Sequence, residues 1–395
     1  MVARQGETAH DAATATTGAK TRLCMIQGGH FSASKGGAQY QAEVLVDALA
    51  ATGRFDVTYI TRNVDPNFKP VGYRIERITT PGWIRRVGFF LDSFQLYRQL
   101  TRFQPQVVYQ QGLRAHTGVG AWYAARHDAR FVFHVASDFD VLPRALLKDE
   151  EFSGVSAIDK RLGEYGLRRA DRVIAQTLVQ SELMQQHYGV EAAAIVRNFH
   201  PLPDAAAEAA LVPPRSTGTD AERPMRIAWV ANFKPVKRPE LFVQLAEETA
   251  ADPRVQYLMI GRPGNPGTYG DLHKRIDALD NLTYLGEVPQ ERVNAELANC
   301  DALINTSIME GFPNTFIQAW MRGMPVLTVG VNSDRLFDAE DIGYCEDDFA
   351  GLKARVLQLA AAPELRAQLG EQSRRYALAN HSMGNVDALI KLLES

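Results

Sequence analysis

The chain has 395 residues, enough for about two or three domains that each bury their own core, which excludes a peptide hormone or a small disulfide scaffold. Its 43 Lys and Arg nearly balance its 46 Asp and Glu, for a formal net charge of −3. No global field therefore favours nucleic acid, which is not expected as a partner, and any anion site has to be local. Apolar residues make up 46% and charged residues 23%, as in ordinary globular proteins.

The three cysteines, Cys24, Cys300 and Cys345, are too few and too widely spaced for a zinc site or a disulfide framework. A reducing, cytoplasmic location is therefore expected. No apolar run is long enough to span a bilayer. Residues 1–20 lack the apolar stretch of a signal peptide and are expected to form a disordered tail.

Short apolar runs alternate with amphipathic stretches from residue 21 onward. Strands are predicted at residues 22–27, 55–61, 106–111, 130–137, 172–176 and 193–196, with helices at 38–53 and in the Ala-rich stretch that ends at residue 127. This alternation, with strands rich in Val, Ile and Phe, is typical of a parallel sheet covered on both faces. Residues 21–203 are therefore predicted to form a first Rossmann-like domain.

Residues 204–224 lose this periodicity and are rich in Ala, Pro and polar residues, which predicts a linker. Residues 225–380 repeat the alternation, with strands predicted at 225–231, 255–261, 282–286, 301–306 and 324–330 and a helix at 239–251. The predicted fold is thus α/β, with two Rossmann-like domains whose parallel sheets face a central cleft. Residues 381–395 are predicted to be a helix that either caps the second domain or crosses back to the first.

The segment at residues 307–327 predicts a turn after a strand, followed by a helix that begins near Asn314 and ends at Gly323. Backbone N–H groups at such a helix start form a ready site for a diphosphate. The groups concerned belong to Gly311, Phe312, Asn314 and Thr315, and Pro313 fixes the turn. A purely structural alternative is that Asn314 is an N-cap and that Glu310 is solvated.

The same segment resembles the E-x7-E signature of the retaining, nucleotide-sugar-dependent glycosyltransferases of family 4, which have the GT-B fold. The similarity extends from about Arg22 to Met324. It implies that Glu310 contacts the donor sugar and that the residue eight positions later, Gln318 in place of the family's Glu, contacts the ribose. A glutamine oxygen still accepts from a hydroxyl but loses the charge-assisted bond. The alternative is that Gln318 is only a helix residue facing the sheet.

The family also carries an Arg and a Lys, five residues apart, that neutralise the donor diphosphate. In residues 229–242 the resemblance places Asn232 at the Arg and Lys237 at the Lys. Lys237 is therefore the expected catalytic cation, because charge on the leaving diphosphate has to be stabilised. Lys234 and Arg238 are the alternatives for reaching the phosphates.

A glycine-rich stretch at residues 28–43 leads into the first predicted helix. It lacks the G-x-G-x-x-G and Walker spacings, which argues against a nicotinamide cofactor or ATP. By resemblance, Gly36 and Gly37 match the glycine pair beside the transferred sugar and diphosphate, and the first domain is the acceptor domain. Close backbone approach is the physical reason for glycine there.

Further candidates lie at the ends of predicted strands. His134 and Asp138 are candidate contacts to the acceptor or sugar, although a simple alignment places Ala136 at the family's His. By resemblance, the donor base is expected at the loop that contains Glu287 and Val288, and Arg262, directly after a predicted strand, is another candidate at the edge of the cleft. The histidines match no metal spacing, so a metal-independent enzyme without a cofactor is expected.

Residues 83–103 contain four Arg and one Asp, with Trp83, Phe89, Phe90 and Phe94 between them. Such a segment could rest on an anionic bilayer and meet a lipid-linked acceptor. A helix packed on the core with solvated arginines is the favoured alternative.

The resemblance implies retaining transfer of a sugar from a UDP- or GDP-linked donor to a glycan or lipid-linked acceptor, in the synthesis of cell-surface polysaccharide or glycolipid. The implied reaction is a front-face displacement in which the leaving diphosphate helps to deprotonate the acceptor. Two alternatives remain open. One is a sugar-nucleotide 2-epimerase of the same fold, and the other is a non-catalytic partner protein, which Gln318 and Asn232 favour.

Overall fold

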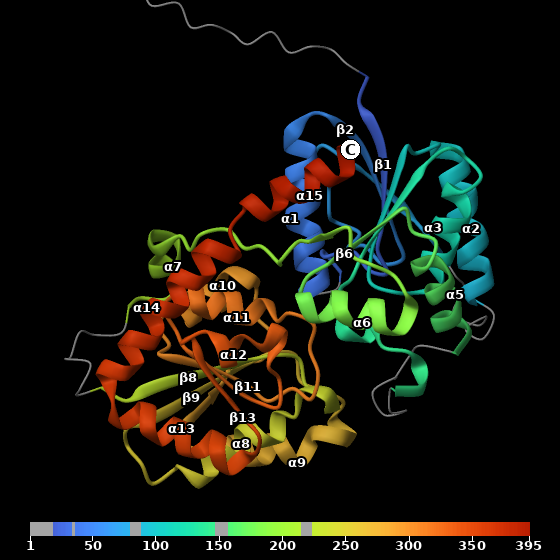
Figure 1. Ribbon diagram of the computed structural model, residues 1–395. Coiled ribbons are helices and arrows are strands. Elements are labelled where there is room, and N and C mark those ends of the chain that lie inside the picture. The colour runs from blue at the N-terminus through green and yellow to red at the C-terminus, as the bar shows by residue number, and fades with distance from the viewer. Residues whose placement is uncertain (1–18, 34–35, 80–87, 147–156, 215–222) are drawn as a thin grey trace, which may run out of the picture.

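The computed structural model describes residues 19–33, 36–79, 88–146, 157–214 and 223–395 (Figure 1). All but the last two residues of the expected tail lie outside these ranges, as does Trp83. The side chains of Phe89 and Phe90 are likewise not described.

The first domain is built on a sheet of seven parallel strands in the order β3-β2-β1-β4-β5-β6-β7. The strands are β1 (Thr21–Ile26), β2 (Phe55–Thr61), β3 (Arg74–Arg77), β4 (Val107–Gln111), β5 (Arg130–His134), β6 (Arg172–Ala175) and β7 (Ala194–Ile195). The helices are α1 (Gly37–Thr52), α2 (Gly88–Phe103), α3 (Ala115–Ala124), α4 (Asp138–Val141), η2 (Arg144–Leu146), α5 (Ala157–Leu167) and α6 (Leu178–Tyr188). Hydrophobic clusters cover both faces of this sheet, which is why its central strands are apolar on both sides.

The second domain has six parallel strands in the order β10-β9-β8-β11-β12-β13. They are β8 (Met225–Val230), β9 (Val255–Ile260), β10 (Leu282–Tyr284), β11 (Ala302–Asn305), β12 (Val326–Val329) and β13 (Gly343–Glu346). The helices are η4 (Pro235–Lys237), α8 (Pro239–Glu248), α9 (Pro266–Asp277), α10 (Gln290–Leu297), α11 (Asn314–Met321), η5 (Ser333–Arg335), α12 (Leu336–Ala339), α13 (Phe349–Ala361) and α14 (Pro363–Asn380). The predicted fold class, two Rossmann-like domains with parallel sheets, is confirmed.

The stretch expected to be a linker contains a helix, α7 (Ala205–Leu211). Asp204 caps it by accepting a hydrogen bond from the backbone of Ala207 at 3.0 Å. The helix packs against α10, and its buried Glu208 pairs with Arg322 of the second domain. The Ala-rich sequence that lacked strand periodicity is therefore helical.

The last helix, α15 (Gly384–Glu394), lies beside α1 of the first domain (Figure 1). Its apolar residues Val386, Leu389, Ile390 and Leu393 belong to the same hydrophobic cluster as β1 and β2. The chain thus crosses between the domains twice. The two crossings are joined where the backbone N–H of His200 donates to the carbonyl of His381 at 3.0 Å.

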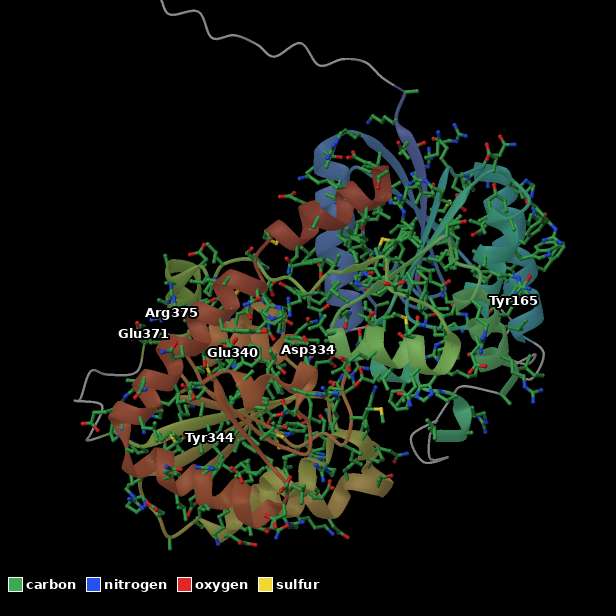
Figure 2. All side chains as sticks on the ribbon, in the orientation of Figure 1. Tyr165, Asp334, Glu340, Tyr344, Glu371 and Arg375 are labelled. Carbon is green, nitrogen blue, oxygen red and sulfur yellow. The ribbon has the colours of Figure 1, made fainter. Side chains whose placement is uncertain are left out.

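The two domains are also in contact where η5 of the second domain meets α6 of the first. Asp334, labelled in Figure 2, accepts hydrogen bonds from the backbone N–H groups of Leu178 at 2.8 Å and Val179 at 3.2 Å, at the first turn of α6. It also pairs with Arg197 at 3.5 Å. Because a carboxylate is favourable at a helix N-terminus, the second domain supplies part of the cap for a first-domain helix.

Candidate active site

A cavity of about 420 Å³ lies between the carboxyl ends of the two sheets and is lined by loops of both domains. The structure brings most of the predicted site residues together there. Those that line it are Gly36, Gly37, Asn232, Lys237, Val288, Glu310, Gly311, Phe312, Pro313, Asn314, Thr315 and Gln318. Arg262, His134 and Asp138 are not among the lining residues.

Two helices begin at this cavity. α11 starts at Asn314 with Pro313 as its N-cap, and α1 starts at Gly37 with Gly36 as its N-cap. Neither N-cap side chain makes a capping hydrogen bond. The structural alternative that made Asn314 an N-cap is therefore wrong, and both helix starts present their N–H dipoles toward one space.

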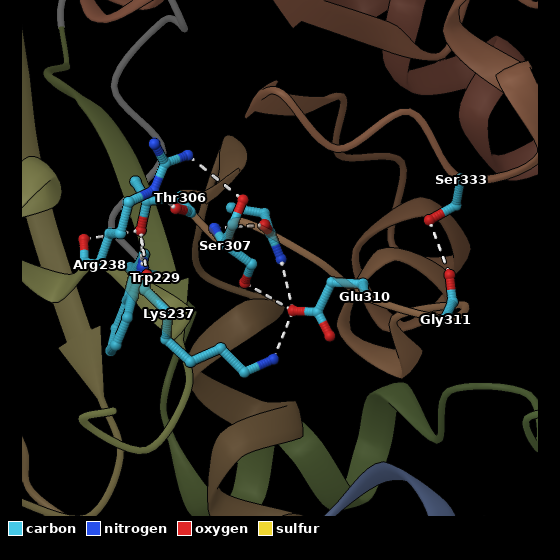
Figure 3. A network of polar contacts seen from close by, with 9 residues as sticks. Trp229, Lys237, Arg238, Thr306, Ser307, Glu310, Gly311 and Ser333 are labelled. Atoms are coloured by element: carbon cyan, nitrogen blue, oxygen red, sulfur yellow. Dashed lines mark hydrogen bonds and ion pairs between the residues drawn. The ribbon is translucent and has the colours of Figure 1, made fainter. Parts of the chain in front are cut away.

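Glu310 is fixed by three donors on one of its oxygens (Figure 3). Its Oε1 contacts the ammonium group of Lys237 and accepts hydrogen bonds from Ser307 Oγ at 2.6 Å and Asn305 Nδ2 at 3.3 Å. Both charged side chains are largely shielded, with 24% of Lys237 and 15% of Glu310 exposed. Glu310 is thus not merely solvated, and its charge is balanced inside the cavity.

Arg238 holds the turn that carries Lys237. It has a positive φ of 46° at the start of α8, and its guanidinium donates to the carbonyls of Thr306 (2.6 Å), Ser307 (3.3 Å) and Val329 (2.9 Å). The Thr306 hydroxyl donates in turn to the Lys237 carbonyl at 2.6 Å (Figure 3). The guanidinium thus uses its hydrogen bonds on backbone carbonyls at the ends of β11 and β12. Arg238 is therefore not placed to reach a phosphate. Of the two alternatives, only Lys234 lines the cavity.

The two departures from the family pattern are both held by polar partners. Gln318 is 4% exposed, and its Nε2 donates to Asn294 Oδ1 at 2.9 Å. Asn232 Oδ1 accepts from the backbone N–H of Arg262 at 2.9 Å. Both residues line the cavity, and each has one polar side-chain atom bonded to a neighbouring residue.

Arg262 pairs with Glu287 rather than pointing into the cavity. Its guanidinium forms a two-point contact with both Glu287 oxygens, at 2.9 and 2.7 Å, on a largely exposed surface. Glu287 and Val288 line the cavity. The loop after β10 is thus the part of the predicted base site that borders the cavity.

The structure does not bring His134 to the cavity. It is 3% exposed, its Nδ1 lies 2.7 Å from the Tyr109 hydroxyl, and burial lowers its pKa to about 4. Ala136 and Ser137, just beyond β5, line the cavity instead. His134 is the last residue of β5 and its ring is buried against Tyr109 of β4, whereas the wall of the cavity is formed by residues beyond the end of the strand.

Asp138 lies at the start of α4, where its Oδ1 accepts from Gln180 Nε2 at 3.1 Å. Burial raises its pKa to about 6, with the nearby carboxylates of Asp140, Glu310 and Asp334 adding to the increase. It therefore belongs to the boundary between the domains and not to the wall of the cavity.

Several polar residues of the first domain that were not predicted as site residues also line the cavity. They are Gln39, Gln41, Ser137, Gln176 and Asn198. They come from four separate segments, so no local spacing could have identified them.

Comparison with known proteins supports the same architecture. The model of Glycosyltransferase Family 4 matches residues 35–199, and the model of Glycosyl transferases group 1 matches residues 216–376. The chain is 25% identical over 161 residues to glycosyltransferase 1 domain-containing protein 1 of Xenopus tropicalis, a match that covers 39% of this chain and 45% of that protein. It is 24% identical over 318 residues to D-inositol 3-phosphate glycosyltransferase of Nocardia farcinica, covering 72% of this chain and 66% of that protein.

Solved structures share the fold at low sequence identity. Sucrose-phosphate synthase from Thermosynechococcus elongatus has a TM-score of 0.75 at 17% identity, covering 95% of this chain and 98% of that one. Anabaena HepE in complex with UDP-glucose has a TM-score of 0.71 at 14% identity, covering 94% and 98%. Because family models match both domains around the cavity, the chain belongs to the family 4, or group 1, glycosyltransferases with the GT-B fold.

Proposed function

We propose that the protein transfers a sugar, with retention, from a UDP- or GDP-linked donor to a hydroxyl group of a glycan or lipid-linked acceptor. The observation that carries the proposal is the meeting of Lys237 and Glu310 at a cavity onto which two uncapped helix N-termini open. This arrangement supplies a cation and amide dipoles for a diphosphate and a carboxylate for sugar hydroxyls.

In the proposed complex the diphosphate lies at the starts of α11 and α1, with Lys237 beside it. Glu310 accepts hydrogen bonds from the donor sugar, and Gln318 accepts one from the ribose. Asn232 borders the diphosphate, and the loop at Val288 borders the base. The glycines at positions 36 and 37 leave room for close approach of the sugar.

The proposed reaction breaks the bond between the anomeric carbon and the diphosphate oxygen, and it forms a bond from the acceptor oxygen on the same face. The acceptor proton passes to the leaving diphosphate. No protein nucleophile, metal or cofactor is required by this scheme. Lys237 and the helix amides stabilise the charge that develops on the diphosphate, while closure of the domains excludes water.

We further propose that the first domain meets the acceptor at an anionic membrane surface. Helix α2 buries Leu96 and Leu100 in the core but leaves Phe94 65% exposed. Helix α3 packs against both α2 and α5; α3 exposes Trp122, α5 exposes Ile158, and η2 exposes Leu146. Exposed arginines on α2, η2 and α5 are Arg98, Arg102, Arg144 and Arg161, and Arg126, just beyond the end of α3, lies over the Trp122 ring. Apolar tips beside guanidinium groups suit an interface with anionic lipid.

Among the described residues, none of the helices has both the length and the hydropathy needed to traverse a bilayer. The contact with lipid would therefore be peripheral for this part of the chain. Flotation with vesicles of anionic or zwitterionic lipid tests it. We expect binding to the anionic vesicles alone, reduced by Phe94→Ser, and equal recovery with both vesicle types would refute the membrane contact.

The transfer itself is tested by a screen of UDP- and GDP-sugars scored by release of the free nucleotide, followed by NMR of the product's anomeric configuration. Retention is expected. An isomerised donor formed without acceptor would instead establish the epimerase. Absence of binding of both UDP and GDP at millimolar concentration would favour a non-catalytic partner.

A further inference from the structure

The side chain of Asn314, the first residue of α11, forms hydrogen bonds with residues of the first domain. Its Nδ2 donates to the carbonyl of Gly37 at 2.9 Å. Its Oδ1 accepts from Gln41 Nε2 at 3.1 Å and from Asn198 Nδ2 at 3.1 Å. One amide therefore joins the first turn of α11 to the first turn of α1 and to the segment that leaves the first domain.

The two amides that hold Asn314 are themselves fixed. Gln41 is 3% exposed and binds the backbone of Phe199 on both sides, donating to its carbonyl at 2.8 Å and accepting from its N–H at 3.1 Å. Asn198 is 4% exposed and donates to the carbonyl of Phe312 at 3.0 Å. The partners of Asn314 are thus rigid, which lets them define its position.

The same cluster reaches both chain crossings. The carbonyl of Asn198 lies 2.7 Å from Nδ1 of His381, and the His381 ring packs on Phe312 with the ring centroids 4.7 Å apart. The turn that carries Glu310 and starts α11 is therefore bonded directly to the segments about which the domains would move.

We propose that Asn314 is a positioning residue for glycosyl transfer, because it holds the N-termini of α11 and α1 at a fixed separation around the donor diphosphate. The inference rests on the proposed function. Under the proposed function most contacts to the nucleotide come from the second domain, through Lys237, Gln318 and the loop at Val288, whereas the Asn314 side chain bonds to Gly37, Gln41 and Asn198. Loss of the alignment with α1 is therefore expected to change the Kd of the free nucleotide only slightly. The sugar and leaving group are aligned only when the glycine turn of the first domain is fastened to α11.

In Asn314→Leu, Gln41 still donates to Phe199 and Asn198 still donates to Phe312, but one N–H of each amide loses its acceptor, so some loss of stability is expected. Binding of the free nucleotide reports whether the site remains folded in the variant. Asn314 itself is only partly buried, and a leucine fills a similar volume. A misplacement of about 1 Å at the reacting groups, by contrast, reduces turnover by about 10²-fold.

The test compares wild type and Asn314→Leu in release of UDP from UDP-glucose, or of GDP from GDP-mannose if only guanosine donors are accepted. Calorimetry of the free nucleotide gives its Kd. We expect turnover to fall by at least about tenfold while Kd changes by less than about threefold. The control is Glu182→Gln, which breaks an exposed ion pair with Arg335 at the other contact between the domains, between α6 and η5, and is expected to leave both quantities unchanged.

Gln41→Leu and the double variant that combines it with Asn314→Leu complete a double-mutant cycle. Because Gln41 acts partly through Asn314, the double variant is expected to be little slower than the slower single variant. Additive losses would overturn the coupling. Turnover of Asn314→Leu within about twofold of wild type, or a Kd that weakens in step with turnover, would overturn the inference while the proposed function stands. Wild-type protein that binds neither nucleotide would overturn both.

Discussion

Lys237 and Glu310 face each other across the mouth of the cavity, and the ammonium group contacts the same carboxylate oxygen that accepts hydrogen bonds from Ser307 and Asn305. Each charge therefore compensates the other in the structure. Under the proposed function, a donor diphosphate would draw Lys237 toward itself, and the freed carboxylate would then accept hydrogen bonds from donor hydroxyls. The pair would thereby link nucleotide binding to sugar binding.

The first prediction separates these two roles with Glu310→Gln. Removal of the negative charge weakens the hold on Lys237, so we expect the affinity for free UDP or GDP to rise by about threefold to tenfold. Turnover is expected to fall by about 10²-fold, because the donor sugar loses a charged acceptor at the reacting centre. Calorimetry and nucleotide release measure the two effects on the same preparations.

The matched control for Glu310→Gln is Glu371→Gln on α14, which loses an exposed pair with Arg375 (both labelled in Figure 2); neither residue lines the cavity. It should behave as wild type. If Glu310→Gln binds the nucleotide more weakly, or turns over at the wild-type rate, the pair has neither role.

The second prediction concerns the family position occupied by Gln318. Gln318→Glu restores a charged acceptor for the ribose, and we expect free UDP or GDP to bind about threefold to tenfold more tightly. The gain requires the amide of Asn294, which now accepts from Gln318 Nε2, to turn so that it donates. In the double variant Gln318→Glu with Asn294→Asp, two carboxylates would face each other and the gain should vanish. Unchanged affinity in the single variant would place the ribose elsewhere.

The two sheets could be predicted from the sequence because their central strands are continuous apolar runs. The edge strands β3, with the sequence RIER, and β13, with GYCE, were missed. Edge strands pair on one side only, so a polar sequence such as Arg74–Arg77 is tolerated there. Periodicity reports burial, and it fails where burial is incomplete.

The candidate site, too, could be predicted from the sequence only in part. The residues from Glu310 to Thr315 could be found because they are consecutive in one turn. Gln41 and Asn198 could not, because they meet Asn314 across 273 and 116 positions of the sequence. His134 was assigned to the cleft on strand position alone, which leaves the core and the cleft faces indistinguishable until the covering helices are known.

The third prediction tests how closely the domains meet. A Cβ at Gly311 would lie 2.7 Å from Cα of Ser137 and 2.9 Å from the carbonyl oxygen of Ala136, both backbone atoms of the first domain. Gly311→Ala should therefore push the domains apart, lowering turnover by at least about tenfold and increasing the radius of gyration in solution scattering.

Gly270→Ala is the control for Gly311→Ala, because its Cβ meets nothing within 4 Å inside α9. It should raise stability by about 0.5–1 kcal/mol and leave turnover alone. Gly311→Ala with wild-type turnover and unchanged scattering would show that the domains do not need this contact.

The fourth prediction uses the pKa of Asp138, which burial raises from 3.8 to about 6. A raised pKa means that the folded state favours the protonated carboxyl, so its stabilising contribution is complete below about pH 4 and is lost as the pH rises through about 6.

Asp138→Asn keeps an acceptor for Gln180 and removes the buried charge. We expect the variant to be more stable than wild type at pH 8 by about 1–3 kcal/mol, with the difference shrinking toward pH 4. Paired thermal unfolding at several pH values measures this difference, because groups that do not interact with Asp138 titrate equally in both proteins and only its coupled neighbours Asp140, Glu310 and Asp334 add to it. Asp271→Asn supplies the opposite sign, because Lys274 lowers the pKa of Asp271 and removal of that charge should not stabilise the protein at pH 8. A constant difference between Asp138→Asn and wild type across the whole range would mean that Asp138 does not titrate in the folded protein near pH 6.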